Sequence, residues 1–272
     1  MGRYDNILIV SDIDNTFLAH GGVKIPERNL KAIEYFKKEG GRFTFSTGRA
    51  IETLIASIPN AKNIANAPAI MANGAYFYDF EAERSFGDKF LEPHMAFELG
   101  KFVYNYSEDF GMRFSMPGGI VYGRLPKPPY GAYELSVHKN PTVQAPEQWD
   151  TSHCYKLVVR GCCEGLDTMR TDIEKRFDDS FDYVKSDTSF LEILPRDCSK
   201  GNALRELVSH YNEQGIALKS YACGDYENDL SMLLAADVAV CPSNACESVK
   251  KVCHMELCSC DDGVIADLIE RL

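Results

Sequence analysis

The stretch Asn6-Ile-Leu-Ile-Val-Ser-Asp12-Ile-Asp14-Asn-Thr16 decides the fold class. Its apolar run is typical of a parallel strand that is buried on both faces. Two carboxylates follow directly, and in open α/β sheets ligands bind beyond the carboxyl ends of the strands. Because carboxylates this close repel each other unless a cation or a shared proton compensates, Asp12 and Asp14 indicate a charged ligand site. A solvated acidic turn that caps a helix is the alternative.

Strand and helix patterns alternate at both ends of the chain. Pro26 marks the start of a helix that carries apolar residues at near-helical spacing and ends at Gly40-Gly41. We therefore predict an α/β core with a doubly wound, Rossmann-like parallel sheet. Its remaining elements are expected as strands at 43–46, 69–72, 221–223 and 238–240, and as helices after residue 49 and at 200–211, 229–235 and 264–272.

The middle of the chain has a different pattern. Predicted strands occur there in pairs, with fewer helices between them, which is typical of a small α+β domain. We predict a discontinuous core formed by residues 1–82 and 195–272, with an α+β domain inserted at 83–194.

A second acidic motif, Cys223-Gly-Asp225-Tyr-Glu-Asn228-Asp229, follows another predicted strand. In the predicted sheet it meets the first motif at the same edge. Four carboxylates at one crevice call for a hard divalent cation, and Mg²⁺ is the usual ion in such oxygen-lined sites. Taken alone, the Gly-Asp turn is typical of a simple helix cap.

Two further segments complete a predicted phosphate site. Ser46-Thr47-Gly48-Arg49 ends the second strand and is expected to open a helix whose first amides hold an oxyanion. Lys200, at the head of a later helix, supplies a positive charge. Either feature alone is also typical of an ordinary turn or a solvated lysine.

These segments, in this order, resemble the haloacid dehalogenase superfamily of phosphohydrolases. The longer strings look like its Cof-type subfamily, which includes sucrose-phosphatase-like enzymes and carries a large inserted α/β cap. The resemblance covers the predicted core, and the strings that carry it are Ser46-Thr-Gly-Arg, Met71-Ala-Asn73-Gly74-Ala, Ser199-Lys-Gly-Asn-Ala and Gly224-Asp-Tyr-Glu-Asn-Asp-Leu-Ser-Met-Leu.

The resemblance implies a catalytic pair and a metal. Asp12 looks like the nucleophile that forms an aspartyl-phosphate, and Asp14 like the general acid and then the general base. Mg²⁺ would be held by Asp12, by the backbone carbonyl of Asp14 and by Asp225.

Further roles follow from the same resemblance. Thr47, in preference to Ser46, and Lys200 would bind the phosphoryl oxygens beside the Gly48 turn, and Asn228 would contact the phosphate. Asp229 would orient Lys200 or a metal-bound water, and Thr16 would support the site with its hydroxyl.

Two further residues, Asn73 and Arg49, are expected near the substrate or the cap. Asn73 is expected to touch the substrate near the hinge of the cap. Arg49 fits a phosphate or substrate clamp, because its guanidinium is a fixed bidentate donor, and fits a salt bridge between cap and core equally well.

The second aspartate separates classes within the superfamily. A dehalogenase does not need a carboxylic acid at position 14, and the ion-pumping ATPases carry threonine there. We therefore expect hydrolysis of a small phosphorylated metabolite, such as a sugar phosphate. A phosphomutase and a non-catalytic phospho-ligand sensor are the alternatives.

The charge of the chain bears on its partners. Twenty-nine Lys and Arg against 40 Asp and Glu give a formal net charge of −11, which argues against nucleic-acid or anionic-membrane binding. No signal peptide is recognised at the start, so we expect a cytoplasmic protein with reduced thiols, present as a monomer or homodimer. The cysteine-rich tail, residues 241–260, lacks paired C-x₂-C units and is expected to hold structural thiols rather than zinc.

Overall fold

The computed structural model describes residues 2–22, 24–131 and 140–272. Contacts between Cα atoms divide the chain into two compact units, one formed by residues 1–87 and 199–272 and the other by 88–198. The sequence-based boundary at residue 82 lies between two strands that pair with each other, and the first unit extends to residue 87. The first unit resumes at residue 199, where the prediction had 195.

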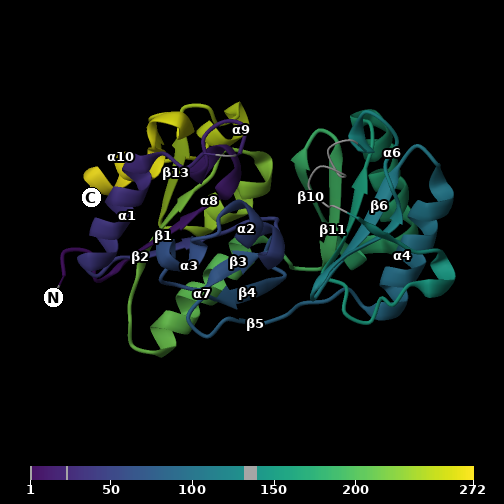
Figure 1. Ribbon diagram of the computed structural model, residues 1–272, viewed down its shortest axis with the longest axis horizontal. Helices are drawn as coiled ribbons and strands as arrows, with labels where there is room; N and C mark the ends of the chain where they lie inside the picture. Colours follow the sequence, from purple (N-terminus) through teal and green to yellow (C-terminus); the bar gives the residue numbers. More distant parts are fainter. Residues whose placement is uncertain (1, 23, 132–139) are drawn as a thin grey trace. The chain divides into compact units, whose positions relative to one another are not determined.

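A parallel sheet of five strands, in the order β14-β13-β12-β1-β2, forms the centre of the first unit (Figure 1). The chain passes from β1 to β2 on one side and later returns to β12 on the other side of β1. This reversal of direction places a topological switch point between β1 and β12. The strands are β1 (Ile7–Ser11), β2 (Arg42–Phe45), β12 (Lys219–Cys223), β13 (Val238–Pro242) and β14 (Met255–Leu257).

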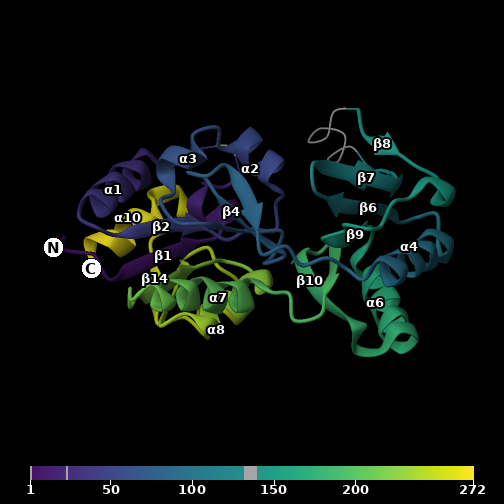
Figure 2. The same ribbon diagram turned by 90° about the horizontal axis from the view of Figure 1, so that it is seen from below.

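Helices cover both faces of this sheet, as Figure 2 shows, with α1 and α10 on one face and α7 and α8 on the other. On β1, Leu8 and Val10 pack with the apolar residues of α7 and α8, whereas Ile9 between them points to the opposite face and is also fully buried. The helices are α1 (Glu27–Lys38), α2 (Ile51–Ser57), α3 (Ala61–Ile64), α7 (Lys200–Glu213), α8 (Leu230–Ala235), α9 (Glu247–Lys250) and α10 (Val264–Glu270).

The predicted third strand of the core joins the parallel sheet only weakly. A single parallel bridge links Ser46 to Ile70, and β3 (Ala69–Met71) belongs instead to an antiparallel sheet with β4 (Tyr76–Asp79) and β5 (Arg84–Phe86). The other predicted strands and helices of the core are confirmed, and so is the α/β fold class.

The second unit is a six-stranded sheet of order β10-β11-β9-β6-β7-β8, with an apolar core between the sheet and two helices. Alternate residues of its strands point into this core, for example Leu157 and Val159 of β9. The elements are α4 (Pro93–Tyr106), α6 (Cys163–Phe177), β6 (Gly111–Met116), β7 (Gly119–Arg124), β8 (Thr142–Val143), β9 (Lys156–Arg160), β10 (Phe181–Asp187) and β11 (Phe190–Pro195).

No helix among the described residues is both long enough and apolar enough to cross a membrane.

The close packing of α7 against α8 gives a test of the fold. A Cβ atom on Gly201 would overlap the carbonyl oxygen of Ser231 in α8. We expect Gly201→Ala to lower the free energy of unfolding by about 1–3 kcal/mol, because the overlap outweighs the better helix propensity of alanine. Urea unfolding measures this change. Ser209→Ala, on the exposed side of the same helix, is the control and is expected to stay within about 0.5 kcal/mol of the parent; equal stability of both variants would contradict this packing.

Candidate active site

The loop after β1 carries the first acidic motif to the switch point. The amide of Asp12 donates a hydrogen bond to the carbonyl oxygen of Cys223, at 2.8 Å, so the ends of β1 and β12 are tied together. Thr16 lies in the short π-helical turn Ile13–Phe17 and donates from its Oγ1 to Oδ1 of Asp225, at 2.9 Å. The two acidic motifs, more than 200 residues apart in the sequence, are therefore in direct contact.

Lys200 lies between two carboxylates. Its Nζ is 2.6 Å from Oδ1 of Asp12 and 2.6 Å from Oδ1 of Asp229, and its side chain is fully buried. Lys200 is the first residue of α7, and the helix begins there because the Ser199 hydroxyl accepts a hydrogen bond from the amide of Asn202.

The turn after β12 fixes Asp229. Its Oδ2 accepts hydrogen bonds from the amides of Asp225, at 3.0 Å, and Tyr226, at 3.4 Å. A Cβ on Gly224 would lie 2.5 Å from the Asp229 side chain, so only glycine allows this approach. Both oxygens of Asp229 are engaged, one by Lys200 and one by amides. This arrangement fits the positioning role expected for Asp229.

The site has more negative than positive charge. Three buried carboxylates, from Asp12, Asp225 and Asp229, surround one buried ammonium, from Lys200. Burial and the neighbouring carboxylates raise the pKa of Asp12 well above its ordinary value, and raise the pKa of Asp225 to about 7. Burial alone would lower the pKa of Lys200, but the two carboxylates raise it above the usual value.

This donor set fits a divalent cation. Single ligand atoms of Asp12, Asp225 and Asp229 all lie within 4.8 Å of one another. Carboxylate oxygens are the ligands that Mg²⁺ prefers, and a dication would offset the uncompensated charge. Asp12 and Asp225 are the side chains suited to hold it, because Asp229 is already held by Lys200 and by amides.

The predicted phosphate-binding segment follows β2. Backbone hydrogen bonds hold it against Asn73. Thr47 is buried, its amide donates to the carbonyl oxygen of Ile70 at 2.9 Å, and its own carbonyl accepts from the amide of Asn73 at 2.9 Å. A Cβ on Gly48 would lie 3.1 Å from the Asn73 side chain, which accounts for the glycine. The hydroxyl of Ser46 is buried and has no hydrogen-bond partner among the described residues.

The helix expected after Arg49 is α2, which begins at Ile51, and Gly48 and Arg49 form a bend before it. The Thr47 hydroxyl accepts a hydrogen bond from the Arg49 amide, at 3.1 Å, within this bend.

Arg49 pairs with Asp14. Its NH2 nitrogen is 2.5 Å from Oδ1 and its Nε is 3.0 Å from Oδ2, which makes a bidentate ion pair within the first unit. Sequence reasoning missed this pair, since it offered only a substrate clamp or a salt bridge to the inserted domain. A clamp remains a prediction.

Asn228 lies on the short turn Glu227–Asp229, half-buried, and its side chain forms no hydrogen bond with a described residue. Its role toward phosphate stays a prediction. The sequence also gave no signal for Ser231, whose hydroxyl accepts from the amide of Gly201 at 3.2 Å and so holds the start of α7.

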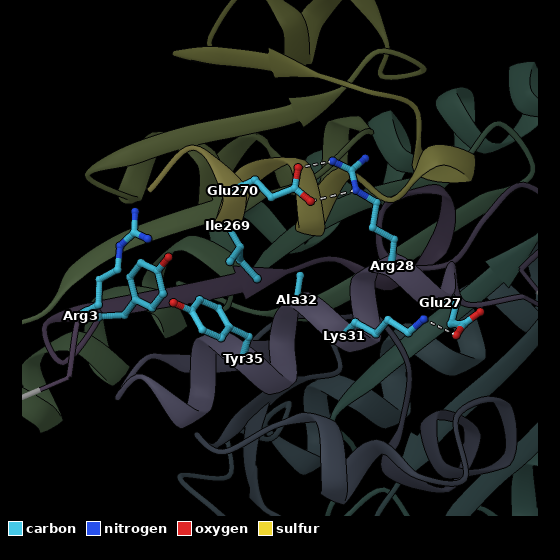
Figure 3. Close-up of a pocket in the computed structure, with 9 residues that line it drawn as sticks. Arg3, Glu27, Arg28, Lys31, Ala32, Tyr35, Ile269 and Glu270 are labelled. Atoms are coloured by element: carbon cyan, nitrogen blue, oxygen red, sulfur yellow. Dashed lines mark hydrogen bonds and ion pairs between the residues drawn. The ribbon is translucent and has the colours of Figure 1, made fainter.

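A pocket of about 750 Å³ elsewhere in the first unit shares no residue with this site (Figure 3). Four of its five charged side chains pair with each other, Arg28 with Glu270 and Lys31 with Glu27, and Arg3 lies over the ring of Tyr4. It therefore offers no free cluster of positive charge to a phosphate. Its lining is Arg3, Tyr4, Glu27, Arg28, Lys31, Ala32, Tyr35, Ile269 and Glu270.

Comparisons with known proteins agree with the motifs. Residues 9–269 match the family of haloacid dehalogenase-like hydrolases. A Bacillus subtilis protein named "Putative phosphatase YxeH" is 33% identical over 275 residues, covering 97% of each chain. The 5-amino-6-(5-phospho-D-ribitylamino)uracil phosphatase YwtE of the same organism is 24% identical, also over 97% of each chain. The crystal structure of a haloacid dehalogenase-like hydrolase from Bacteroides thetaiotaomicron superposes with a TM-score of 0.80 at 22% identity, covering 99% of each chain. The Cof-type resemblance is confirmed.

The raised pKa of Asp225 leads to a prediction about pH and metal. A carboxyl whose folded-state pKa, about 7, exceeds its unfolded-state value costs stability as pH rises between the two. Without metal, this group is therefore expected to reduce stability progressively from about pH 4 to about pH 7. Mg²⁺ binds the ionised carboxylate, so at 100 times its Kd it is expected to add about 2.7 kcal/mol above pH 7. Because protons compete, the gain is expected to be much smaller near pH 5.5.

Thermal unfolding with and without Mg²⁺, above pH 7 and near pH 5.5, measures the gain in stability from Mg²⁺ at each pH. Asp225→Asn is expected to lose the part of the pH penalty that Asp225 contributes, and to lose the Mg²⁺ gain. Glu213→Gln, at an exposed carboxylate near the end of α7, is expected to keep both. An Mg²⁺ gain of equal size at both pH values, or one retained in Asp225→Asn, would contradict the assignment.

Proposed function

The chain belongs to the haloacid dehalogenase-like hydrolase family and is a phosphatase of its Cof type, and from this premise we propose that it hydrolyses a small phosphate monoester through an aspartyl-phosphate on Asp12, with Mg²⁺ as cofactor. The observation that carries the proposal is the buried Lys200 between Asp12 and Asp229 at the switch point of the sheet. A lysine that donates to one oxygen of a buried carboxylate fixes the orientation of the other oxygen for attack. The same lysine can also donate to a phosphoryl oxygen.

The first half-reaction transfers the phosphoryl group to the protein. An Asp12 oxygen attacks phosphorus, the bond from phosphorus to the leaving oxygen breaks, and Asp14 gives its proton to the leaving alcohol. Lys200 holds the other side of the Asp12 carboxylate, and its charge stabilises the transferring oxygens. Thr47 and the bend at Gly48 are the groups proposed to bind the remaining phosphoryl oxygens.

The second half-reaction returns the protein to its starting form. Asp14, now ionised, takes a proton from water, the resulting hydroxide attacks phosphorus, and the Asp12–phosphorus bond breaks to release inorganic phosphate. The bidentate contact with Arg49 holds the Asp14 carboxyl group in place for this step. Mg²⁺, held by Asp12 and Asp225 with the Asp14 carbonyl, would supply positive charge between the nucleophile and the phosphoryl group.

We propose that the second unit selects the leaving group. The sheet face that does not pack against α4 and α6 is strongly polar for a protein interior, since it carries the buried pair Lys156–Glu192, with Ser186 donating to Glu192 at 2.6 Å. The strand that carries Lys156, β9, also carries Arg160, which is mostly buried. Such groups suit a polyhydroxylated leaving group. The relative YwtE is named for a phosphorylated ribityl compound, which supports this class of substrate.

A phosphomutase uses the same aspartates but returns the phosphoryl group to a sugar, and a sensor needs no turnover. Incubation with a panel of phosphorylated metabolites and Mg²⁺ distinguishes them. Free phosphate supports the phosphatase, isomerised sugar phosphate supports the mutase, and no product over the whole panel supports the sensor.

The ten free thiols also support the proposed cytoplasmic location.

The separate roles of the two aspartates predict different kinetics for their variants. An aryl phosphate has a good leaving group, so its transfer to Asp12 needs little general acid. We expect Asp14→Asn to release about one equivalent of phenolate and then stall, since water is no longer activated. Asp12→Asn is expected to show no burst and to lose at least about 10³-fold in turnover.

Rapid-mix absorbance and intact-protein mass measure the burst and the retained phosphoryl group. Glu213→Gln is the control and is expected to turn over normally, while circular dichroism checks that the variants fold. Normal steady turnover in either aspartate variant would end this mechanism.

A further inference from the structure

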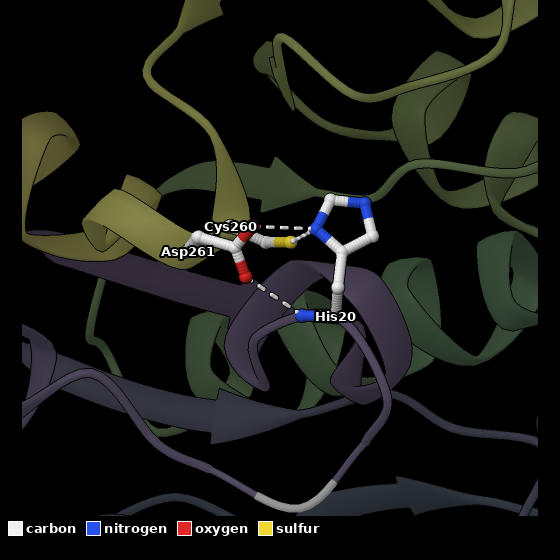
Figure 4. Close-up of side chains that lie close together, drawn as sticks. All are labelled: His20, Cys260 and Asp261. Carbon is white, nitrogen blue, oxygen red and sulfur yellow. Dashed lines mark hydrogen bonds and ion pairs between the residues drawn. The ribbon is translucent and has the colours of Figure 1, made fainter.

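A second group of potential metal ligands lies in the first unit, apart from the acidic site. His20 follows the turn that carries Asp14, and Cys260 and Asp261 belong to the 3-10 turn Cys260–Asp262 (Figure 4). The His20 Nδ1 is 3.4 Å from the Cys260 Sγ and 2.7 Å from Oδ2 of Asp261. One ligand atom from each residue lies within 4.8 Å of the other two.

Both contacts are made to the same ring nitrogen. A Cys–His–carboxylate relay uses one imidazole nitrogen for the nucleophile and the other for the carboxylate, so this arrangement is not a relay. Nδ1 has a single proton or a single lone pair, and it cannot serve the thiol and the carboxylate fully at once. A metal ion can bind all three donors at one point.

The backbone holds the carboxylate in place. The amide of His20 donates to Oδ1 of Asp261 at 2.9 Å, which leaves Oδ2 facing the ring. The Cys260 thiol is buried, and the amide of Cys260 is fixed by Oδ1 of Asn244 at 2.9 Å. Two of the three donors thus come from a turn that is fixed before any ion binds.

We propose that His20, Cys260 and Asp261 form a binding site for Zn²⁺, distinct from the acidic site. Sulfur, nitrogen and oxygen donors are the usual zinc ligands, and three of them leave a fourth position for water. With ordinary zinc bond lengths, a tetrahedral site has S and N about 3.5 Å apart, close to the 3.4 Å found here. The nitrogen and oxygen must separate by about 0.7 Å, which the half-exposed side chains of His20 and Asp261 allow.

Binding requires the Cys260 thiol to lose its proton to solvent, since the thiolate is the zinc ligand. The ion would then join the loop after the first motif to the turn near the C-terminus. Asn244 extends this link, because its Nδ2 donates to the carbonyl oxygen of Asn15, at 2.9 Å, next to Asp14.

The proposed site differs from a zinc site formed by the cysteine-rich tail alone. His254 is occupied, since its Nδ1 accepts a hydrogen bond from the amide of Ala239 at 2.9 Å. Of the tail residues only Cys260 takes part, and the other two ligands are Asp261 and His20.

Cobalt(II) is the probe that tests the site, because a Co²⁺–thiolate bond gives a charge-transfer absorption in the near ultraviolet. The acidic site has no sulfur ligand and gives no such band, whatever the outcome for the proposed function. Reduced, chelator-treated protein in excess Mg²⁺ is titrated with Co²⁺ and then with Zn²⁺. We expect the band to saturate at about one equivalent and to disappear when Zn²⁺ displaces Co²⁺.

Variants assign the ligands. Cys260→Ser is expected to abolish the band, and His20→Ala to weaken Co²⁺ binding at least about tenfold. Cys258→Ser, two residues away and outside the cluster, is the matched control and is expected to keep the band and the affinity of the parent. No band in the parent, a band that survives Cys260→Ser, or unchanged affinity in His20→Ala would each overturn the proposal. Should Cys260→Ser fail to fold, His20→Ala and Asp261→Asn, at exposed positions, decide the question alone.

Discussion

The buried ammonium of Lys200 is the interaction on which the rest of the site depends. It satisfies Asp12 and Asp229 at once, and Asp229 in turn holds the amides of the turn after β12. Removal of one member of such a buried pair typically costs about 3–5 kcal/mol, because the remaining charge is left without a partner. This lysine therefore links three segments: the loop after β1, the turn after β12 and the start of α7.

The fold brings these three segments together by close backbone contact. Parallel strands end at the same edge, and the reversal of strand order between β1 and β12 opens the space where the two acidic motifs meet. Gly224 and Gly201 allow the next layer to approach, since a Cβ at either position would collide with Asp229 or with α8. The glycines are thus as necessary to the charge arrangement as the charged residues themselves.

The features of the site that could be predicted from the sequence are those that local patterns determine. Asp12 and Asp225 each follow a buried strand, and the topology of such sheets brings strand ends together, so their proximity could be expected. The Arg49–Asp14 ion pair could not, because it depends on how a bend before α2 packs. The cluster of His20 with Cys260 joins residues 240 positions apart, and no spacing pattern reports such a pair.

The charge of the site also sets an order of events. Three buried carboxylates against one ammonium repel a phosphate dianion, and the whole chain, at −11, adds to that repulsion. A substrate of that charge can approach only after a cation has reduced the local excess, or after protons have done so. Protonation is the less useful route, because a protonated Asp12 is no nucleophile. In the proposed mechanism an acidic protein therefore acts on an anionic substrate at neutral pH once the cation has bound. Burial first, and then the neighbouring carboxylates, raises the pKa values of Asp12 and Asp225, and a bound cation would offset both effects.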